Sequence, residues 1–206
     1  MFIKVCGLRR AEDVECAVTH GATAVGFIFW PRSPRYVDPE RAAALVRLVP
    51  AGVETVGVFV NDDAAAIRAL AVRTGVSMVQ LHGDEAPEMA GQLDRPVMKV
   101  MGVEAVRDTA WPLATTVLLD VFDRERRGGT GQLVDWTQAA EVARSRRVVL
   151  AGGLVPDNVE AAIAAVRPYG VDVSSGVEDE PGVKNPGQVR LFLERARAAF
   201  EREQRR

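Results

Sequence analysis

The sequence predicts a (β/α)8 barrel, and three observations lead to this fold class. Eight short apolar runs alternate with amphipathic segments over 206 residues, as parallel strands alternate with covering helices. The last two runs end abruptly in small residues, in VVLAGGL at 148–154 and VDVSSGV at 171–177. Polar residues recur at the ends of several runs. A flavodoxin-like or Rossmann sheet would leave two or three strands over.

The apolar runs are the expected strands. Short runs of β-branched and aliphatic residues bounded by turn signals are typical of parallel strands that are buried on both faces. The expected strands cover residues 2–6, 23–29, 54–60, 77–82, 96–101, 115–120, 147–151 and 170–175.

Amphipathic segments between the strands predict the covering helices. Asp38-Pro39, Pro156-Asp157 and Asn185-Pro186 mark helix starts, because each places a capping side chain or a proline in the first turn. The segment 102–113 carries Pro112, so only a weak helix is expected there. The other expected helices cover residues 10–20, 39–49, 63–74, 85–93, 137–145, 157–166 and 186–203.

Alternation within the strands predicts a polar barrel interior. In the first strand Ile3 and Val5 share one face, opposite Lys4 and Cys6. If the aliphatic sets face the helices, a group of polar residues faces inward, and it comprises Lys4, Cys6, Gln80, His82, Lys99, Asp120 and Asp172. Burying them is costly unless they pair with each other or with a ligand. Several end their strands, where barrel enzymes carry their chemistry, so the pattern indicates an enzyme.

Composition limits the class of protein. The chain is 48% hydrophobic and 26% charged and shows no linker, so residues 1–206 are expected to form one domain. With 26 Lys and Arg against 28 Asp and Glu, a net charge of -2 argues against nucleic acid as a partner. The N-terminus has no long apolar segment behind a basic start, and no run approaches the length of a membrane span, so we expect neither a signal peptide nor membrane association. A catalytic metal is not expected either, because the chain has only two histidines. A cytoplasmic protein with reduced thiols is expected.

The loops after the last two strands predict a phosphate site. Gly152 and Gly153 follow the seventh strand, and Ser174, Ser175 and Gly176 end the eighth. Small residues let backbone N–H groups approach an anion closely, and loops at these positions form the usual phosphate grip of the fold. Either loop alone could be a plain strand-to-helix turn, but the pair favours a phosphorylated ligand.

Cys6 and Asp120 are candidates for a general base and a general acid. Cys6 could be a small buried hydrophobe, but Lys4 on the same face would favour its thiolate. Asp120 could cap the next turn, but an inward, desolvated carboxyl has a raised pKa, which suits an acid. We expect a bell-shaped pH profile that requires a Cys6 pKa well below about 8.5. The reverse order of pKa values would exchange the limbs of the bell.

Three further side chains are assigned to substrate binding. Arg35 lies in the long loop WPRSPRYV, between Pro34 and Tyr36, and could grip a substrate carboxylate in a bidentate pair. His82 is either catalytic or a supporting hydrogen-bonding group, and we favour the supporting role. Asp172 faces inward on the eighth strand.

Taken together, the motifs resemble those of the phosphoribosylanthranilate isomerases of tryptophan biosynthesis. They are KVCG at 4–7, GFIFWPRSPRY at 26–36, GVFVN at 57–61, VQLHG at 79–83, LLD at 118–120, GGTG at 128–131, DW at 135–136, LAGGL at 150–154 and VDVSSGVE at 171–178. The resemblance implies a barrel without metal or organic cofactor. It also implies an Amadori rearrangement of N-(5-phosphoribosyl)anthranilate to 1-(2-carboxyphenylamino)-1-deoxyribulose 5-phosphate.

The resemblance implies residue roles as well. The family's general base falls on Cys6, its general acid on Asp120, and its arginine for the anthranilate carboxylate on Arg35. The family's phosphate positions fall on Gly152, Gly153, Ser174, Ser175 and Gly176, with the loop at 128–131 close by. Arg9 stands where the family usually has threonine, so the contacts of the first loop stay open.

Other phosphosugar barrels are the alternatives. The similar histidine-pathway isomerase uses an aspartate where this chain has Cys6, and a metal-dependent ribulose-phosphate epimerase needs more than two histidines. From a different class, a non-catalytic phosphosugar-binding module would not need both Cys6 and Asp120. The expected partner is a small phosphosugar, and the sequence allows a monomer or a homodimer.

Overall fold

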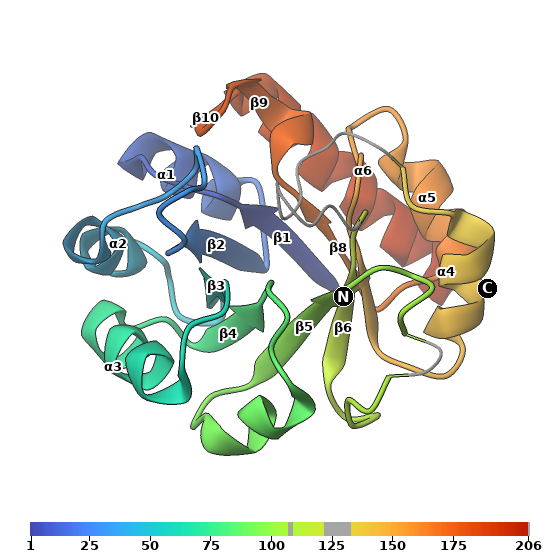
Figure 1. Cartoon of the computed structure of the whole chain (residues 1–206). Helices are drawn as coiled ribbons and strands as arrows, with labels where there is room; N and C mark the ends of the chain where they lie inside the picture. The colour runs from blue at the N-terminus through green and yellow to red at the C-terminus, as the bar shows by residue number, and fades with distance from the viewer. Residues whose placement is uncertain (107–108, 122–132, 206) are drawn as a thin grey trace.

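Eight parallel strands close into a barrel in the computed structural model of the chain, which describes residues 1–106, 109–121 and 133–205 (Figure 1). Each strand pairs with its neighbour in chain order, and the last pairs with the first. The strands are β1 (Phe2–Cys6), β2 (Ala24–Ile28), β3 (Glu54–Phe59), β4 (Met78–Leu81), β5 (Val97–Met101), β6 (Thr116–Leu119), β7 (Val148–Leu150) and β8 (Gly170–Val173). The predicted (β/α)8 barrel is confirmed.

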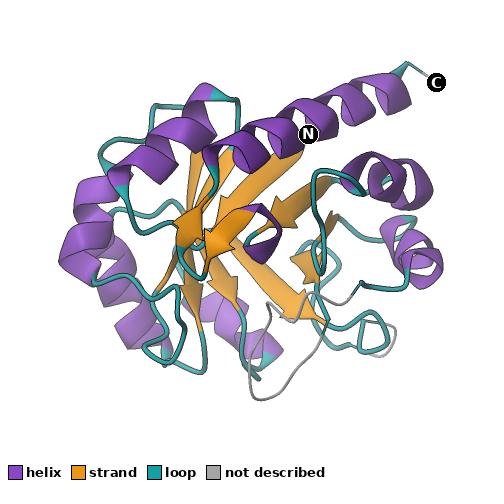
Figure 2. Ribbon diagram, turned by 90° about the horizontal axis from the view of Figure 1, so that it is seen from above, coloured by secondary structure: helices purple, strands orange, loops and turns teal. Residues whose placement is uncertain are grey.

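Helices cover the outside of this barrel (Figure 2). They are α1 (Ala11–Thr19), α2 (Pro39–Val46), α3 (Ala64–Thr74), α4 (Trp136–Ala143), α5 (Val159–Val166) and α6 (Pro186–Gln204), with 3-10 helices η1 (Pro87–Gln92) and η2 (Ser175–Val177). Two predicted caps are confirmed, because the Asp38 side chain accepts from the Glu40 amide and that of Asn185 from the Gln188 amide. Helix α5 begins later than predicted, since residues 156–158 form a turn.

Two segments differ from the predicted helices. The predicted helix over 85–93 is wrong in type, since the chain forms the short 3-10 helix η1 there. Its sequence PEMAGQ includes Gly91, which does not favour a longer α-helix. Residues 103–106 adopt turn conformations instead of the weak helix expected after β5. After η2 an unpredicted antiparallel hairpin follows, formed by β9 (Glu178–Glu180) and β10 (Val183–Lys184).

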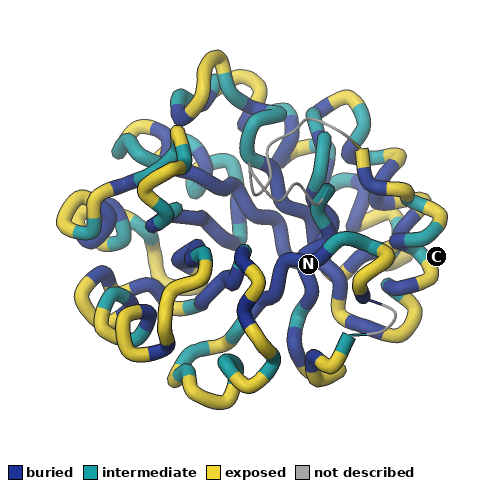
Figure 3. Tube along the Cα trace, in the orientation of Figure 1, coloured by how far each residue is buried: buried dark blue, intermediate teal, exposed yellow. Residues whose placement is uncertain are grey.

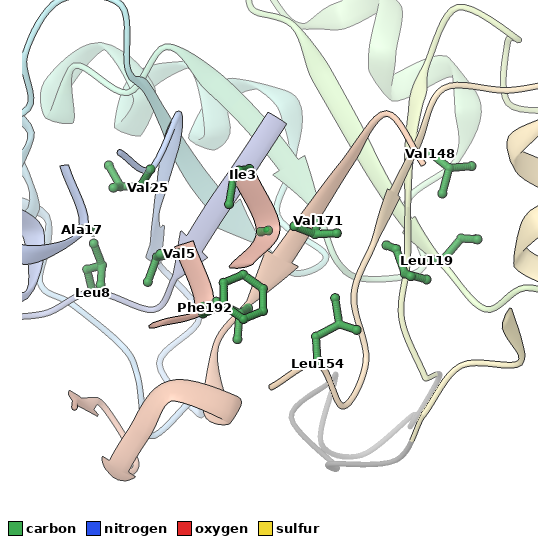
Figure 4. Close-up of a cluster of buried hydrophobic side chains, with 14 of the residues drawn as sticks. Ile3, Val5, Leu8, Ala17, Val25, Leu119, Val148, Leu154, Val171 and Phe192 are labelled. Atoms are coloured by element: carbon green, nitrogen blue, oxygen red, sulfur yellow. The ribbon is translucent and has the colours of Figure 1, made fainter. Parts of the chain in front are cut away.

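The strands separate two apolar clusters, and their backbone is buried along most of the barrel (Figure 3). The cluster inside the barrel contains Phe2, Ala24, Val56, Met98, Val100, Leu118, Val149 and Ala151. The opposite strand faces pack against the helices, as Ile3, Val5 and Val171 do near Phe192 of α6 (Figure 4). The predicted alternation in β1, with Ile3 and Val5 on the helix side, is therefore confirmed.

Lys99 faces away from the barrel interior, so its predicted inward orientation is wrong. Its neighbours Met98 and Val100 belong to the inner cluster, and the pleat therefore turns Lys99 toward the outer layer. Its Nζ donates to Glu85 Oε2 at 2.7 Å and to the Gly83 carbonyl at 2.7 Å. This buried ion pair attaches the loop after β4 to β5, and it includes neither Cys6 nor Asp120.

Candidate functional site

A buried ion pair lies at the centre of the site. Lys4 of β1 is fully buried, and its Nζ lies 3.0 Å from Asp172 Oδ1 on β8, its register partner in the sheet. Burial lowers the pKa of Lys4, but Asp172 and Cys6 outweigh it and raise that pKa above its ordinary value. Burial also raises the pKa of Asp172, against the opposing effect of Lys4. The predicted inward orientation of both residues is confirmed.

Cys6 ends β1 next to this ion pair. The side chain is buried, and it packs against Gly26 of β2, where an added Cβ would stand 2.8 Å from Cys6 Sγ and 3.0 Å from Lys4 Cε. Burial raises the pKa of the Cys6 thiol and outweighs the opposite effect of the Lys4 ammonium, while Asp172 raises this pKa further. The expected low pKa is therefore wrong, because the desolvation of the thiolate exceeds the attraction of one lysine.

Asp120 follows β6, and its Oδ1 accepts from the Val121 amide at 2.7 Å. The alternative that the carboxyl caps the next turn concerns residues after Val121, which lie outside the described residues. Burial nevertheless raises the pKa of Asp120 to about 6, with the Val121 amide opposing, the charge of Asp172 adding to the rise and Lys4 reducing it. The expectation of a raised Asp120 pKa is confirmed.

These pKa values fix the resting protonation of the pair. At neutral pH Asp120, with a pKa of about 6, is mostly ionised, and Cys6, with a raised pKa, carries its proton. An acid at Asp120 and a base at Cys6 need the opposite arrangement. The site holds the correct number of protons for that chemistry, but the reactive distribution is a minor one.

The loops after β7 and β8 meet at the same end of the barrel. Gly152 and Gly153 adopt φ values of 77° and 63°, in the left-handed region that favours glycine. At Gly176 an added Cβ would stand 1.9 Å from the Leu154 carbonyl oxygen, so the two loops pack directly on each other. A cavity of about 40 Å³ lies between them, and its walls come from Asp120, Ala151, Gly152, Gly153, Leu154, Asp172, Val173, Ser174, Ser175 and Gly176.

Asp120 and all five predicted phosphate residues line this one cavity. Ser174 also connects the loop after β8 to β1, because its hydroxyl donates to the Cys6 carbonyl at 3.1 Å. Ser175 begins η2, so the chain turns away from the barrel immediately after the strand. The predicted phosphate loop and the predicted acid are thus neighbours.

Arg35 lies at the mouth of the barrel, on the long loop after β2. An added Cβ at Gly7, the residue after Cys6, would stand 2.8 Å from Arg35 Cδ, which places the arginine directly over the end of β1. Its guanidinium forms a bidentate pair with Glu178, with Nε–Oε1 at 2.9 Å and Nη2–Oε2 at 2.7 Å. The carboxylate that Arg35 binds in this structure is therefore the protein's own.

His82 lies after β4, with Gln80 two residues before it on the inner face. The His82 amide donates to the Phe59 carbonyl at 2.8 Å, and His82 Nδ1 lies 3.3 Å from Gln80 Nε2. Gln80 is buried, and within the described part of the chain its Oε1 has no hydrogen-bond partner. The supporting role of His82 stays a prediction.

Sequence reasoning missed two charged residues that contact the site, Glu178 and Lys184 of the hairpin. Glu178 ends the quoted motif VDVSSGVE, but nothing in that motif indicates its partner, and the two-residue strand β10 that holds Lys184 is too short for a periodic signal. A larger cavity of about 760 Å³, lined by Asp120, Lys99, Met101, Trp111 and Val134 among others, adjoins the ends of β5 and β6. The quoted motif at 128–131 lies outside the described residues.

Within the described ranges, no group of three or more His, Cys, Asp or Glu side chains could hold a metal ion. None of the described helices is long and apolar enough to cross a membrane.

A family model described as N-(5'phosphoribosyl)anthranilate (PRA) isomerase matches residues 3–195. Among curated proteins, the N-(5'-phosphoribosyl)anthranilate isomerase of Citrifermentans bemidjiense is 44% identical over 198 residues, covering 95% of this chain and 96% of the relative. The isomerase of Desulforudis audaxviator is 43% identical over 205 residues, covering 97% and 99%.

Solved structures agree with these matches. The phosphoribosyl anthranilate isomerase of Thermotoga maritima superposes with a TM-score of 0.88 at 38% identity, covering 96% of this chain and 99% of that one. A phosphoribosyl anthranilate isomerase in complex with reduced 1-(o-carboxyphenylamino)-1-deoxyribulose 5-phosphate superposes with a TM-score of 0.85 at 38% identity and the same coverage. A further Thermotoga maritima structure contains monomers generated from a dimeric isomerase (TM-score 0.83, 36% identity, 96% and 99% covered).

Asp120→Asn should stabilise the fold at alkaline pH. A carboxyl whose pKa rises from 3.8 to about 6 contributes stability that is complete below its unfolded pKa and is lost as the pH rises through its folded pKa. Between pH 4 and pH 8 the free energy of unfolding of the wild type should therefore fall by on the order of 2–3 kcal/mol relative to that of the neutral, isosteric variant. Urea unfolding at several pH values measures this difference, and parallel stability curves for the two proteins would contradict the raised pKa.

Proposed function

The chain belongs to the N-(5'-phosphoribosyl)anthranilate isomerase family, and we propose that Cys6 and Asp120 carry the proton transfers of the family's reaction. The protein isomerises N-(5-phosphoribosyl)anthranilate to 1-(2-carboxyphenylamino)-1-deoxyribulose 5-phosphate, a step of tryptophan biosynthesis. The observation that carries the mechanistic proposal is the desolvated carboxyl of Asp120, which lines the same cavity as the predicted phosphate loops.

The reaction divides into an acid step and a base step. Asp120 protonates the furanose ring oxygen, and the C1′–oxygen bond breaks to give an open-chain Schiff base. Cys6 then removes the C2′ proton, and the resulting enolamine tautomerises to the ketone. A carboxyl in a low-polarity site is a competent acid near neutral pH. A thiolate next to the Lys4 ammonium is a competent base once its proton has left.

Substrate binding supplies the missing change in protonation. The phosphate group carries up to two negative charges, and its proposed site adjoins Asp120. A nearby like charge raises the pKa of a carboxyl, so phosphate binding favours the protonated, acidic form of Asp120. Cys6 does not line that cavity, so the phosphate charge changes the pKa of the Cys6 thiol less. The bound substrate therefore shifts the proton distribution toward the reactive form.

The remaining assignments concern substrate contacts. We place the phosphate on the backbone N–H groups of the loops after β7 and β8, because their left-handed glycines leave room for an anion. We place the anthranilate carboxylate near Arg35, whose pair with Glu178 uses Nε and Nη2 and leaves Nη1 outside it. His82 supports the sugar from the β4 side, and Asp172 acts through Lys4.

Partners and compartment follow from the same chemistry. The partner is a small phosphosugar, and neither nucleic acid nor a membrane is proposed, since the net charge is -2. A reduced Cys6 thiol is required, which favours the cytoplasm as the compartment. The chain acts as a monomer or a homodimer, and a dimeric isomerase exists in Thermotoga maritima.

Removal of either proton-transfer group should slow turnover by about 10²–10⁴-fold with little change in binding. The variants are Cys6→Ser, which offers no base of useful pKa, and Asp120→Asn. Loss of anthranilate-type fluorescence from freshly prepared substrate measures the rate, and the double variant should lose much less than the product of the single effects. For the wild type, kcat/KM should rise with a midpoint near pH 6, set by Asp120, and fall only above the raised pKa of Cys6.

Near-normal turnover of Cys6→Ser would end the assignment of the base. An acidic limb that is unchanged in an Asp120→Asn enzyme with residual activity would end the assignment of that limb to Asp120.

Gly153→Asp should weaken substrate binding through charge. Asparagine provides the matched control, because Gly153→Asn adds the same bulk without a negative charge, and both residues tolerate a left-handed backbone better than most. We expect KM to be on the order of tenfold higher in the aspartate variant than in the asparagine variant, with kcat similar, because the added charge repels the phosphate. Equal KM values in the two variants would remove the phosphate from this loop.

A further inference from the structure

The hairpin after β8 carries two buried charged groups, Glu178 and Lys184, to which the proposed reaction assigns no role. Glu178 lies between two cations, with Arg35 Nη2 at 2.7 Å from Oε2 and Lys184 Nζ at 2.7 Å from Oε1. The side chains are 4%, 13% and 1% exposed for Glu178, Arg35 and Lys184. Although burial raises it, the two cations hold the pKa of Glu178 below its ordinary value. The carboxylate is therefore ionised and satisfied on both oxygens.

The same cluster reaches the proposed phosphate loop. Lys184 Nζ also donates to the Ser174 carbonyl at 3.0 Å, and the Ser174 hydroxyl donates to the Cys6 carbonyl at 3.1 Å. A buried ammonium that binds one peptide carbonyl fixes that peptide plane, and with it the direction of the next amide. Lys184 therefore orients the chain where it enters Ser175 and Gly176.

A second set of contacts joins the Arg35 loop to the hairpin. Arg9 Nη1 donates to the Pro34 carbonyl at 2.9 Å, and an added Cβ at Gly182 would stand 2.9 Å from the same nitrogen. Arg9, which departs from the residue usual in the family, thus bridges the loop after β2 and the turn between β9 and β10. The hairpin and the loop form one connected unit on the barrel mouth.

We infer that Glu178 and Lys184 are positioning residues that hold Arg35 and the Ser174–Gly176 loop in a fixed relation, so that the two anionic ends of one substrate are bound together. This inference rests on the proposed function, which places a carboxylate at Arg35 and a phosphate at the loop. Burial lowers the pKa of Lys184, and the charge of Glu178 opposes this fall, so the two hairpin residues depend on each other. A long arginine side chain without Glu178 would gain rotamer freedom and lose its preset orientation.

The test compares Glu178→Gln with Glu180→Gln. Both remove one negative charge from strand β9, but Glu180 is exposed. Calorimetry measures the Kd of reduced 1-(o-carboxyphenylamino)-1-deoxyribulose 5-phosphate and of the same compound without its carboxylate. In Glu178→Gln we expect the Kd of the carboxylate ligand to rise on the order of tenfold and the Kd of the carboxylate-free ligand to rise far less. The reason is that a misplaced Arg35 guanidinium loses much of its interaction with the carboxylate. Glu180→Gln should leave both unchanged, and KM should rise in Glu178→Gln with kcat nearly constant.

Lys184 is tested by inorganic phosphate as a competitive inhibitor. The double variant Glu178→Gln/Lys184→Met removes both charges of the buried pair, which keeps the fold accessible if the single Glu178 variant does not fold. Its phosphate inhibition constant should rise several-fold above that of Arg35→Met, which retains Lys184. Equal phosphate inhibition constants would overturn the inference, because Lys184 would then not position the loop. Tighter binding of the carboxylate ligand by Glu178→Gln would also overturn it, because Glu178 would then compete with the ligand for Arg35. The two failures are distinguishable. The ligand-binding measurements test the positioning role of Glu178 and Lys184, whereas turnover by the wild type tests the proposed function.

Discussion

The ion pair between Lys4 and Asp172 is the constraint on which the rest of the site depends. Two opposite charges in the barrel interior are costly to desolvate, and they persist only because they lie 3.0 Å apart. Lys4 opposes the rise in the pKa of Cys6, while Asp172 adds to the rise in the pKa of Asp120. One buried pair thus acts on both groups that we assign to proton transfer. A neutral, apolar interior at this level would remove the larger effect that opposes the rise in the pKa of Cys6, and only the weaker effect of Lys184 would remain.

The barrel closes so that β8 pairs with β1, and this closure brings the proposed phosphate loop against the strand that carries Cys6. Ser174 binds the Cys6 carbonyl, Gly176 packs on Leu154, and Gly152 lies close to Asp120. The hairpin that follows then adds Glu178 and Lys184 on the outer side. The groups proposed for phosphate binding and for proton transfer therefore share a continuous set of contacts, in which a misplaced loop would disturb both.

Much of the fold was predictable because strand periodicity is a local signal. The alternation of Ile3 and Val5 with Lys4 and Cys6 followed from the pleat alone. The same argument failed for Lys99. Its neighbours Met98 and Val100 lie on the inner face, and because both faces of β5 are buried, polarity did not indicate which face Lys99 takes. The pKa of Cys6 was beyond sequence reasoning, because it depends on how completely the folded chain excludes water from the thiol. The partner of Arg35 depends on a hairpin that carries no periodic pattern.

The most direct measurement of how the buried pair acts on Cys6 and Asp120 is a titration of both groups in the wild type and in Asp172→Asn. Thiolate absorbance, with Cys6→Ser subtracted, reports Cys6, and the carboxyl carbon-13 shift reports Asp120. Asparagine keeps the shape and can still accept a hydrogen bond from Lys4, but it removes the negative charge that raises both pKa values. Both titration midpoints should fall in the variant, from a wild-type Asp120 pKa of about 6. Midpoints that stay in place or rise would contradict the claim that the buried pair sets the protonation of the site.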